Sequence, residues 1–91
     1  MKFEWDPPKQ QKVLQARHMD FLRAAHAVFL SGANVLTQQS SRHEEERFLS
    51  LVPIDGKLWA VIWMWRGEDI RIITVRRARH GEERKYRALH G

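Results

Sequence analysis

Apolar residues recur at helical spacing in the first third of the chain. Between Asp20 and Leu30 the pattern predicts a helix, and the small residues Ser31-Gly32 are expected to end it. An earlier helix is predicted over about Asp6–Ala16, because an acidic N-cap followed by proline is a typical helix start. The apolar stripe of this earlier helix holds only Val13 and Leu14, so we expect it to lie at the surface.

The middle of the chain changes to the alternating or continuously apolar runs that are typical of strands. Four strands are predicted, over Asn34–Gln38, Arg47–Val52, Leu58–Arg66 and Asp69–Arg76. Asp55-Gly56 and Gly67-Glu68 separate the last three runs, and such short turns join antiparallel neighbours. Lys2–Trp5 alternates weakly and is a candidate short strand, whereas Gln39–Arg42 is predicted to be a polar loop.

A last helix is predicted over His80–Leu89. Acidic residues lie in its first turn and Lys85 and Arg87 in later turns, which is the distribution that the helix dipole favours. We therefore predict an α+β fold, with an antiparallel meander sheet of about four strands, two N-terminal helices and one C-terminal helix. With 91 residues, the chain is expected to form a single domain over residues 1–91.

Composition excludes several kinds of chemistry. The chain has no cysteine, which rules out disulfides, thiolate zinc sites and cysteine nucleophiles and fits a reducing cytoplasm. The five histidines lack the spacing of metal ligands, and no phosphate-binding glycine motif is present, so we expect neither a metal nor a nucleotide cofactor. No apolar run reaches 18 residues, so no membrane contact is expected.

The net positive charge comes from the C-terminal part of the sequence. Residues 70–91 hold seven basic and two acidic residues, a net charge of +5, whereas residues 1–69 hold nine of each and are neutral. Strict alternation along residues 70–77 would place Arg71 and Arg77 on one face of the strand and Arg76 on the other. A strand inside a sheet buries at least one face, so arginines on both faces cost free energy that solubility alone does not justify. We therefore favour contact with a polyanion such as RNA.

The predicted strand Leu58–Arg66 is apolar on both faces, as expected of a central strand. Trp59 and Trp63 are expected in the core. In so small a domain some of these rings could instead await a partner or stack on bases, with Trp65 the best candidate and Trp63 the next. The acidic run Glu44–Glu46 is expected to pair with the neighbouring cationic strand, although a role as general base is an alternative.

Several segments together resemble the BrnT-type ribonuclease toxins. The two most specific segments are the FEWDP start and the strand RIITVRRA. The resemblance would be weaker if only one of them were present. The matching residues are Phe3–Pro7, Lys9, Phe21, Ala24-Ala25, Val28-Phe29, Glu46-Arg47, Arg71–Ala78, Glu83-Arg84 and Tyr86. The resemblance extends over nearly the whole chain and implies a RelE-like fold and cleavage of RNA without a metal.

The same resemblance implies the partners. Such toxins inhibit translation in the cytoplasm and are neutralised by a small BrnA-type ribbon-helix-helix antitoxin. The implied assembly is a heterotetramer with an antitoxin dimer, and the complex rather than the toxin alone binds operator DNA.

The chain departs from the family pattern in one stretch. The family's Asn-x-x-Lys-His-Gly falls on Val13, Ala16, Arg17 and His18, so that the Asn, Lys and Gly are lost and the His is shifted by one. The sequence leaves open whether this weakens activity, alters substrate preference or changes little. Elsewhere Thr74 keeps the hydroxyl of the family's serine.

The implied reaction is attack by the RNA 2′-hydroxyl on the adjacent phosphorus, with guanidinium groups stabilising the charge that develops. The candidate catalytic arginines are Arg66, Arg71, Arg76, Arg77 and Arg84, of which Arg66 and Arg76 are expected to matter most. Candidates for proton transfer are Glu46, His80 and Tyr86. The alternatives are a non-catalytic RNA-binding module and a subunit that only binds other proteins.

Overall fold

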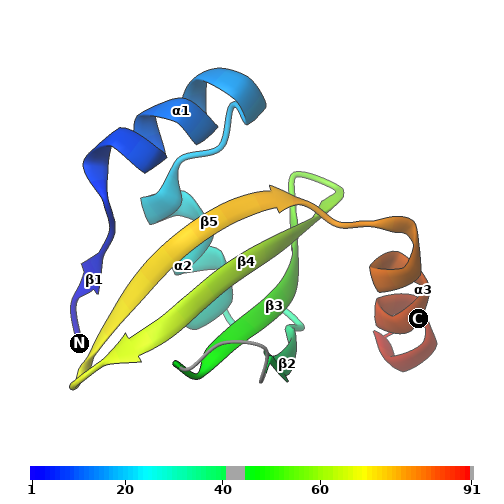
Figure 1. Cartoon of the computed structure of the whole chain (residues 1–91). Helices are drawn as coiled ribbons and strands as arrows, with labels where there is room; N and C mark the ends of the chain where they lie inside the picture. Colours follow the sequence, from blue (N-terminus) through cyan, green and yellow to red (C-terminus); the bar gives the residue numbers. More distant parts are fainter. Residues whose placement is uncertain (41–44, 91) are drawn as a thin grey trace.

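The computed structural model describes residues 1–40 and 45–90 and confirms the α+β class. The elements in chain order are β1 (Phe3–Glu4), α1 (Pro7–Arg17), α2 (Phe21–Phe29), β2 (Leu36–Ser40), β3 (Arg47–Ile54), β4 (Lys57–Arg66), β5 (Asp69–Arg77) and α3 (His80–His90). Helix α2 covers one face of the sheet, α1 lies along β5 at the edge of the sheet, and α3 lies apart from both at the other end (Figure 1). No helix in the described part of the chain is long and apolar enough to cross a membrane.

The sheet has five strands in the order β1-β5-β4-β3-β2. Strands β2 to β5 form the antiparallel meander that was predicted. The prediction of about four purely antiparallel strands is corrected by β1, which pairs parallel to β5 with Phe3 opposite Ile70. A two-residue strand is too short to show a reliable alternation in sequence. The long connection that a parallel pair requires runs from β1 through α1, α2 and strands β2 to β4 before it reaches β5.

Strand β5 contains an irregularity that alters which residues share a face. Ile62 of β4 is opposite Thr74, but the next residue, Trp63, is opposite Ile72, so that Ile73 is an extra residue in β5. Strict alternation, as expected from sequence, is therefore wrong beyond Ile72. The bulge places the buried Val75 on the same face as Ile72.

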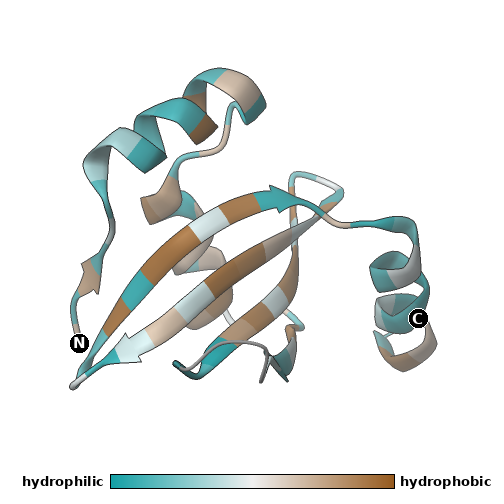
Figure 2. Ribbon diagram, in the orientation of Figure 1, coloured by the Kyte–Doolittle hydropathy of each residue, from teal (hydrophilic) through white to brown (hydrophobic). Residues whose placement is uncertain are grey.

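The consequence of the bulge is a separation of apolar and cationic side chains. Ile70, Ile72 and Val75 point toward the helices, while Arg71 and Arg76, with Thr74, face the other way, since they are opposite Met64, Ala60 and Ile62. The alternation of apolar and polar bands along β5 is visible in Figure 2. We call the side of the sheet opposite α2 the open face.

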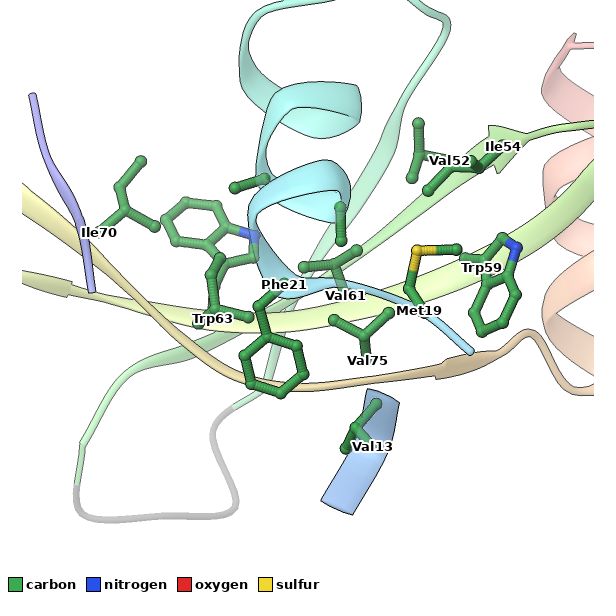
Figure 3. Packing of buried hydrophobic residues seen from close by; sticks show 13 residues of the cluster. Val13, Met19, Phe21, Val52, Ile54, Trp59, Val61, Trp63, Ile70 and Val75 are labelled. Carbon is green, nitrogen blue, oxygen red and sulfur yellow. The ribbon is translucent and has the colours of Figure 1, made fainter. Parts of the chain in front are cut away.

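The main core lies between α2 and the sheet. Phe21, Ala24 and Ala25 of α2 are fully buried, and they pack with Val61 and Val75 of the central strands (Figure 3). The exposed fractions of Trp59 and Trp63 are only 7% and 6%, so their prediction as core residues is confirmed. Burial of this kind is the main stabilising contribution in a chain of this size.

Trp63 is fixed on all sides. Its ring stacks on Phe48 at 4.6 Å between centroids and meets the edge of Phe29 at 4.9 Å. Its indole Nε1 donates a 2.8 Å hydrogen bond to the buried Ser50 hydroxyl, which also bonds to Thr37. Buried polar groups need such partners. Trp63 therefore serves the core and is not free to stack on a base.

Helix α1 is a surface helix, as predicted, with Val13 as its buried residue. It ends at His18, which adopts a left-handed conformation with φ 57° at a C-cap that commonly holds glycine. The neighbouring Arg17 donates a 2.8 Å hydrogen bond to the carbonyl of Val75. This bond secures α1 to β5 beyond the end of the short strand β1.

The predicted turn between β3 and β4 is confirmed, with positive φ at both Asp55 and Gly56, as a tight hairpin requires. The predicted polar loop Gln39–Arg42 is partly wrong, because Gln39 and Ser40 continue β2 and pair with β3. Ser41 and Arg42 lie outside the described residues.

Candidate functional site

The open face contains a cavity of about 410 Å³ near the turn that joins β4 to β5, which we call cavity 1. Four elements contribute cationic side chains to its lining, together with two carboxylates and an apolar floor. The cations are Lys9, Arg47, Arg66 and Arg71, and the carboxylates are Asp6 and Glu45. Cations therefore outnumber anions by two at this site, which favours an anionic ligand.

Strand register explains why two arginines face each other across this cavity. Met64 of β4 is opposite Arg71 of β5. Phe48 of β3 is opposite Trp63, so the preceding residue, Arg47, lies beside Met64 on its other flank. Two strand spacings separate the backbones of Arg47 and Arg71 by about 10 Å, and their long side chains project from the same face. Met64 lies between them.

Arg47 has an unusual environment. Its side-chain Nε is buried and has no hydrogen-bond partner among residues 1–40 and 45–90. A buried donor without a partner is costly and is seldom found unless a ligand or water satisfies it. Arg47 also lines cavity 1, where an anion is a suitable ligand for its guanidinium group.

Helix α1 supplies Lys9 and Asp6 to the cavity. Asp6 occupies the N-cap position, as predicted, but its carboxylate makes no capping hydrogen bond. Pro7 and Pro8 contribute to this, since neither has an N–H to donate, and only the N–H of Lys9 remains within the usual range of the cap. The carboxylate of Asp6 therefore lines the cavity without a structural task at the helix end.

Arg66 is held only weakly at the rim. Its nearest carboxylate among the described residues is Glu4 of β1, at 3.7 Å from Nε, and the two side chains are 56% and 40% exposed. An exposed ion pair of this length contributes little to stability and competes weakly with a ligand. The guanidinium of Arg66 is thus accessible to an anion in cavity 1.

Arg76 does not join this cluster, although it was expected to be a principal catalytic residue. Its guanidinium forms a bidentate pair with Glu82 of α3, with distances of 2.8 and 2.9 Å, and it also donates to the carbonyl of Arg77. The hydrogen bond from Arg76 lowers the pKa of Glu82, and the same bond raises the pKa of Arg76. Glu82 also accepts from the backbone N–H of Arg79, as in half of a capping box.

The other two candidate arginines also lie elsewhere. The guanidinium carbon of Arg77 is 5.6 Å from the ring centroid of Trp59, within cation–π range. Arg84 is exposed on α3 and lines a different surface hollow. Of the five arginines expected to be catalytic, only Arg66 and Arg71 therefore line cavity 1.

None of the three residues named for proton transfer lines cavity 1. Glu46 accepts a 2.6 Å hydrogen bond from Gln39, instead of pairing with the cationic strand as predicted for the acidic run. Tyr86 donates to the backbone carbonyl of Asn34, and His80 is the exposed first residue of α3. Glu44, which belongs to the same acidic run, lies outside the described residues.

Trp65 is half exposed and contacts Trp63 edge-on at 5.5 Å. It points to the helix side of the sheet, since its partner in the register is Ile70. Cavity 1 opens on the opposite face. Stacking of a base on Trp65 is therefore geometrically separate from the arginine cluster.

Three residues of cavity 1 were not predicted as site residues, namely Asp6, Lys9 and Arg47, and Glu45 was considered only within the acidic run, for which a general base was the alternative. Lys9 and Arg47 were both part of the motif segments that carry the family resemblance, so a signal for them was present. Asp6 was assigned to the helix start and Glu45 to ion pairing. The strand register that brings Arg47 beside Met64, and the place of α1 beside β5, follow only from the fold.

Among the described residues, no group of three or more histidine or acidic side chains is placed to hold a metal ion. No curated protein matches the sequence. The family model for the ribonuclease toxin BrnT of type II toxin–antitoxin systems matches residues 5–82, which is most of the chain and includes every residue of cavity 1. The chain therefore belongs to the BrnT family of ribonuclease toxins, whose substrate is RNA and whose partner is an antitoxin.

Proposed function

We propose that the protein is an endoribonuclease that cuts RNA at cavity 1 without a metal ion. The observation that carries this proposal is the convergence of Lys9, Arg47, Arg66 and Arg71 on one cavity of the open face. We also propose that residues 1–91 act as one toxin domain with a RelE-like fold.

The reaction is an internal transfer at phosphorus. The 2′-oxygen of the RNA forms a bond to the adjacent phosphorus, its proton passes to a base, and the bond from phosphorus to the 5′-oxygen breaks as that oxygen gains a proton. The products are a 2′,3′-cyclic phosphate and a 5′-hydroxyl. Negative charge builds on the non-bridging oxygens, and fixed guanidinium groups stabilise it without reorganisation.

Arg47 and Arg71 have the central role in this scheme. They flank Met64 from opposite sides, so their guanidinium groups contact a phosphate placed over Met64 from two directions. Arginine suits this task because its planar fork donates two parallel hydrogen bonds to phosphate oxygens. Lys9 and Arg66 add charge at the rim of the cavity.

Asp6 and Glu45 are the carboxylates of the same cavity, and we assign the proton-accepting role to one of them. The expected contribution of such a base is roughly 10²- to 10⁴-fold in rate. The variants Asp6→Asn and Glu45→Gln distinguish the two carboxylates. Only the variant that lacks the base should have an RNA cleavage rate that no longer rises with pH.

The charge of the site supports the proposed metal independence. The lining of cavity 1 has more cations than carboxylates, so it repels a divalent cation. The four cations already supply the positive charge that a metal would bring to a phosphate, and they are Lys9, Arg47, Arg66 and Arg71. The chain has no cysteine for a soft-metal site.

The proposed partner is a BrnA-type ribbon-helix-helix antitoxin with an acidic segment that covers cavity 1. A heterotetramer with an antitoxin dimer is the proposed complex, and operator DNA is bound through the antitoxin. The proposed consequence of RNA cleavage is inhibition of translation, which places the toxin in the cytoplasm.

The test uses purified chain, free of antitoxin, and a labelled single-stranded RNA in excess EDTA. The expected result is cleavage with 2′,3′-cyclic phosphate ends, and its loss in the double variant Arg47→Ala/Arg71→Ala. Intact RNA with a folded sample would contradict the enzyme, and retention of RNA without new ends would favour the non-catalytic binding module. Cleavage that EDTA abolishes would contradict metal independence.

A further inference from the structure

A second cavity, of about 370 Å³, lies between α3 and the hairpin that joins β3 to β4, and we call it cavity 2. The sheet contributes Lys57, Leu58 and Arg77 to its lining, while α3 contributes Tyr86 and Arg87. None of these residues lines cavity 1, so the second cavity is not part of the proposed cleavage centre.

Cavity 2 is cationic. Lys57, Arg77 and Arg87 line it against the single carboxylate of Glu83. Glu83 neutralises Arg87 poorly, because their closest N···O distance is 3.8 Å and the Arg87 side chain is 74% exposed. The balance of charge among the described lining residues therefore favours an anionic ligand.

Aromatic surface lies next to this charge. The rings of Tyr86 and His90, one turn apart on α3, have centroids 4.8 Å from each other, and both residues line cavity 2. Cationic side chains beside aromatic rings are the combination that binds single-stranded nucleic acid, through phosphates and stacked bases respectively. An acidic polypeptide would use the cations but has no need of the rings, so RNA is the better fit.

Cavity 2 lies at the end of the sheet and is lined from both sides of β4. Leu58 lies on the same side of β4 as Met64, which lines cavity 1, whereas Lys57 and Arg77, opposite Ile54 and Trp59, lie on the side of the core. Leu58 and Met64 are six residues apart on β4, so the two sites are separated by about 20 Å or more along the strand. An RNA that occupies both must continue for several nucleotides beyond the cleaved bond.

The family match ends at residue 82, whereas the part of α3 that lines cavity 2 begins at Glu83. We infer that cavity 2 binds single-stranded RNA on one side of the scissile bond, as a subsite through which this chain prefers longer substrates. The inference rests on the proposed cleavage at cavity 1. The subsite contributes affinity and leaves the chemical step unchanged.

The test compares RNA oligomers of about 4 and about 16 nucleotides, a range that brackets typical single-strand site sizes. Lys57→Glu and Arg87→Gln are the variants, and Lys85→Glu, on the same helix but outside cavity 2, is the matched control. For the long RNA we expect Lys57→Glu to raise KM roughly tenfold and to reduce the salt dependence of binding by about one unit of slope. For the short RNA we expect kcat and KM to stay unchanged.

Binding of the same labelled oligomers is also measured directly, by fluorescence anisotropy. If the wild type binds long RNA with the expected dependence on Lys57 but does not cleave it, the proposed cleavage fails, whereas RNA binding at cavity 2 is supported. If Lys57→Glu and Lys85→Glu weaken long-RNA binding equally, or short and long RNA are affected alike, the subsite is overturned. Unchanged RNA binding with weaker antitoxin capture would also overturn it, in favour of an acidic protein ligand.

Discussion

The arginines at the two ends of the open face differ in whether a carboxylate neutralises them. At one end, Arg47 and Arg71 line cavity 1, and neither forms an ion pair with a carboxylate among the described residues. At the other end, Arg76 is paired in bidentate fashion with Glu82, and both side chains are more than four-fifths buried. An arginine that must receive a phosphate has to be left without a carboxylate, whereas a structural arginine is satisfied by one.

This difference assigns separate tasks to arginines that the sequence does not distinguish. Arg71 faces a cavity and Arg76, five residues later on the same face of β5, attaches α3 to the sheet. We therefore treat Arg76 as a structural residue that positions α3, and with it cavity 2. The following predictions test that division of roles.

The largest effect is expected from removing an unpaired arginine of cavity 1. Arg47→Ala and Arg71→Ala should each lower kcat/KM for RNA cleavage roughly 10²- to 10³-fold, as does the loss of one donor to a developing oxyanion. Substitution by lysine should restore only part of this activity, because the bidentate geometry is lost. Single-turnover cleavage rates measure both effects.

Arg23→Ala is the control for charge, since Arg23 pairs with Asp55 on the exposed hairpin and lies outside cavity 1. Its cleavage rate should match the wild type. If Arg71→Ala and Arg23→Ala behaved alike in folded samples, cavity 1 would not be the catalytic centre.

The second prediction concerns the paired arginine. Arg76→Ala should lower the free energy of unfolding by about 1–3 kcal/mol, because it leaves the carboxylate of Glu82 without its main partner. Its effect on the cleavage of short RNA should be far smaller than that of Arg71→Ala. Urea unfolding of both single variants and the double variant Arg76→Ala/Glu82→Ala gives the coupling energy.

The outcome that would reverse the assignment is a loss of activity of 100-fold or more in Arg76→Ala without a change in stability. Arg76 would then act on RNA, as the sequence interpretation expected, and the contact with Glu82 would have to open in the substrate complex.

The secondary structure could be predicted from sequence because its signals are local. Asp20 marks the start of α2 and in the structure accepts a 2.7 Å hydrogen bond from the N–H of Leu22. Asp55-Gly56 marks the β3–β4 turn through its need for positive φ. Such signals fix helices, turns and the antiparallel order of β2 to β5.

The composition of the site could not be predicted to the same extent, because it depends on register and on pairing between distant elements. The bulge at Ile73 shifts every later residue of β5 by one position, and no local pattern announces it. The pairing of Arg76 depends on where α3 turns back, which places Glu82 within reach. The positive end of the chain was visible in sequence, but its division into accessible and neutralised arginines was not.

The third prediction uses the lowered pKa of Glu82, which results from its hydrogen bond to Arg76. Because the folded-state pKa lies below that of the unfolded chain, the pair stabilises the fold fully above the ordinary glutamate pKa of about 4.3. That stabilisation is lost as the pH falls from there through the lower folded-state value. The stability difference between wild type and Glu82→Gln should therefore be present at pH 7 and shrink toward zero in acid.

Urea unfolding at a series of pH values measures this difference. Subtracting the curve of Glu82→Gln from that of the wild type removes the contribution of the other carboxylates. A difference that stays constant down to acid pH would show that the ionised pair does not stabilise the attachment of α3.

The smallest effect is expected from the carboxylate at the other end of the sheet. Glu4 and Arg66 are 3.7 Å apart and both largely exposed, so Glu4→Gln should change the free energy of unfolding by no more than about 0.5 kcal/mol. The substitution Glu82→Gln should lower the free energy of unfolding by more, because the Glu82 carboxylate is largely buried and forms a bidentate pair with Arg76. Glu4→Gln should also leave RNA affinity equal or slightly higher, since it removes negative charge beside cavity 1. Parallel measurement of the two variants by urea unfolding and RNA anisotropy tests this, and equal losses of stability would mean that burial does not distinguish the two ends.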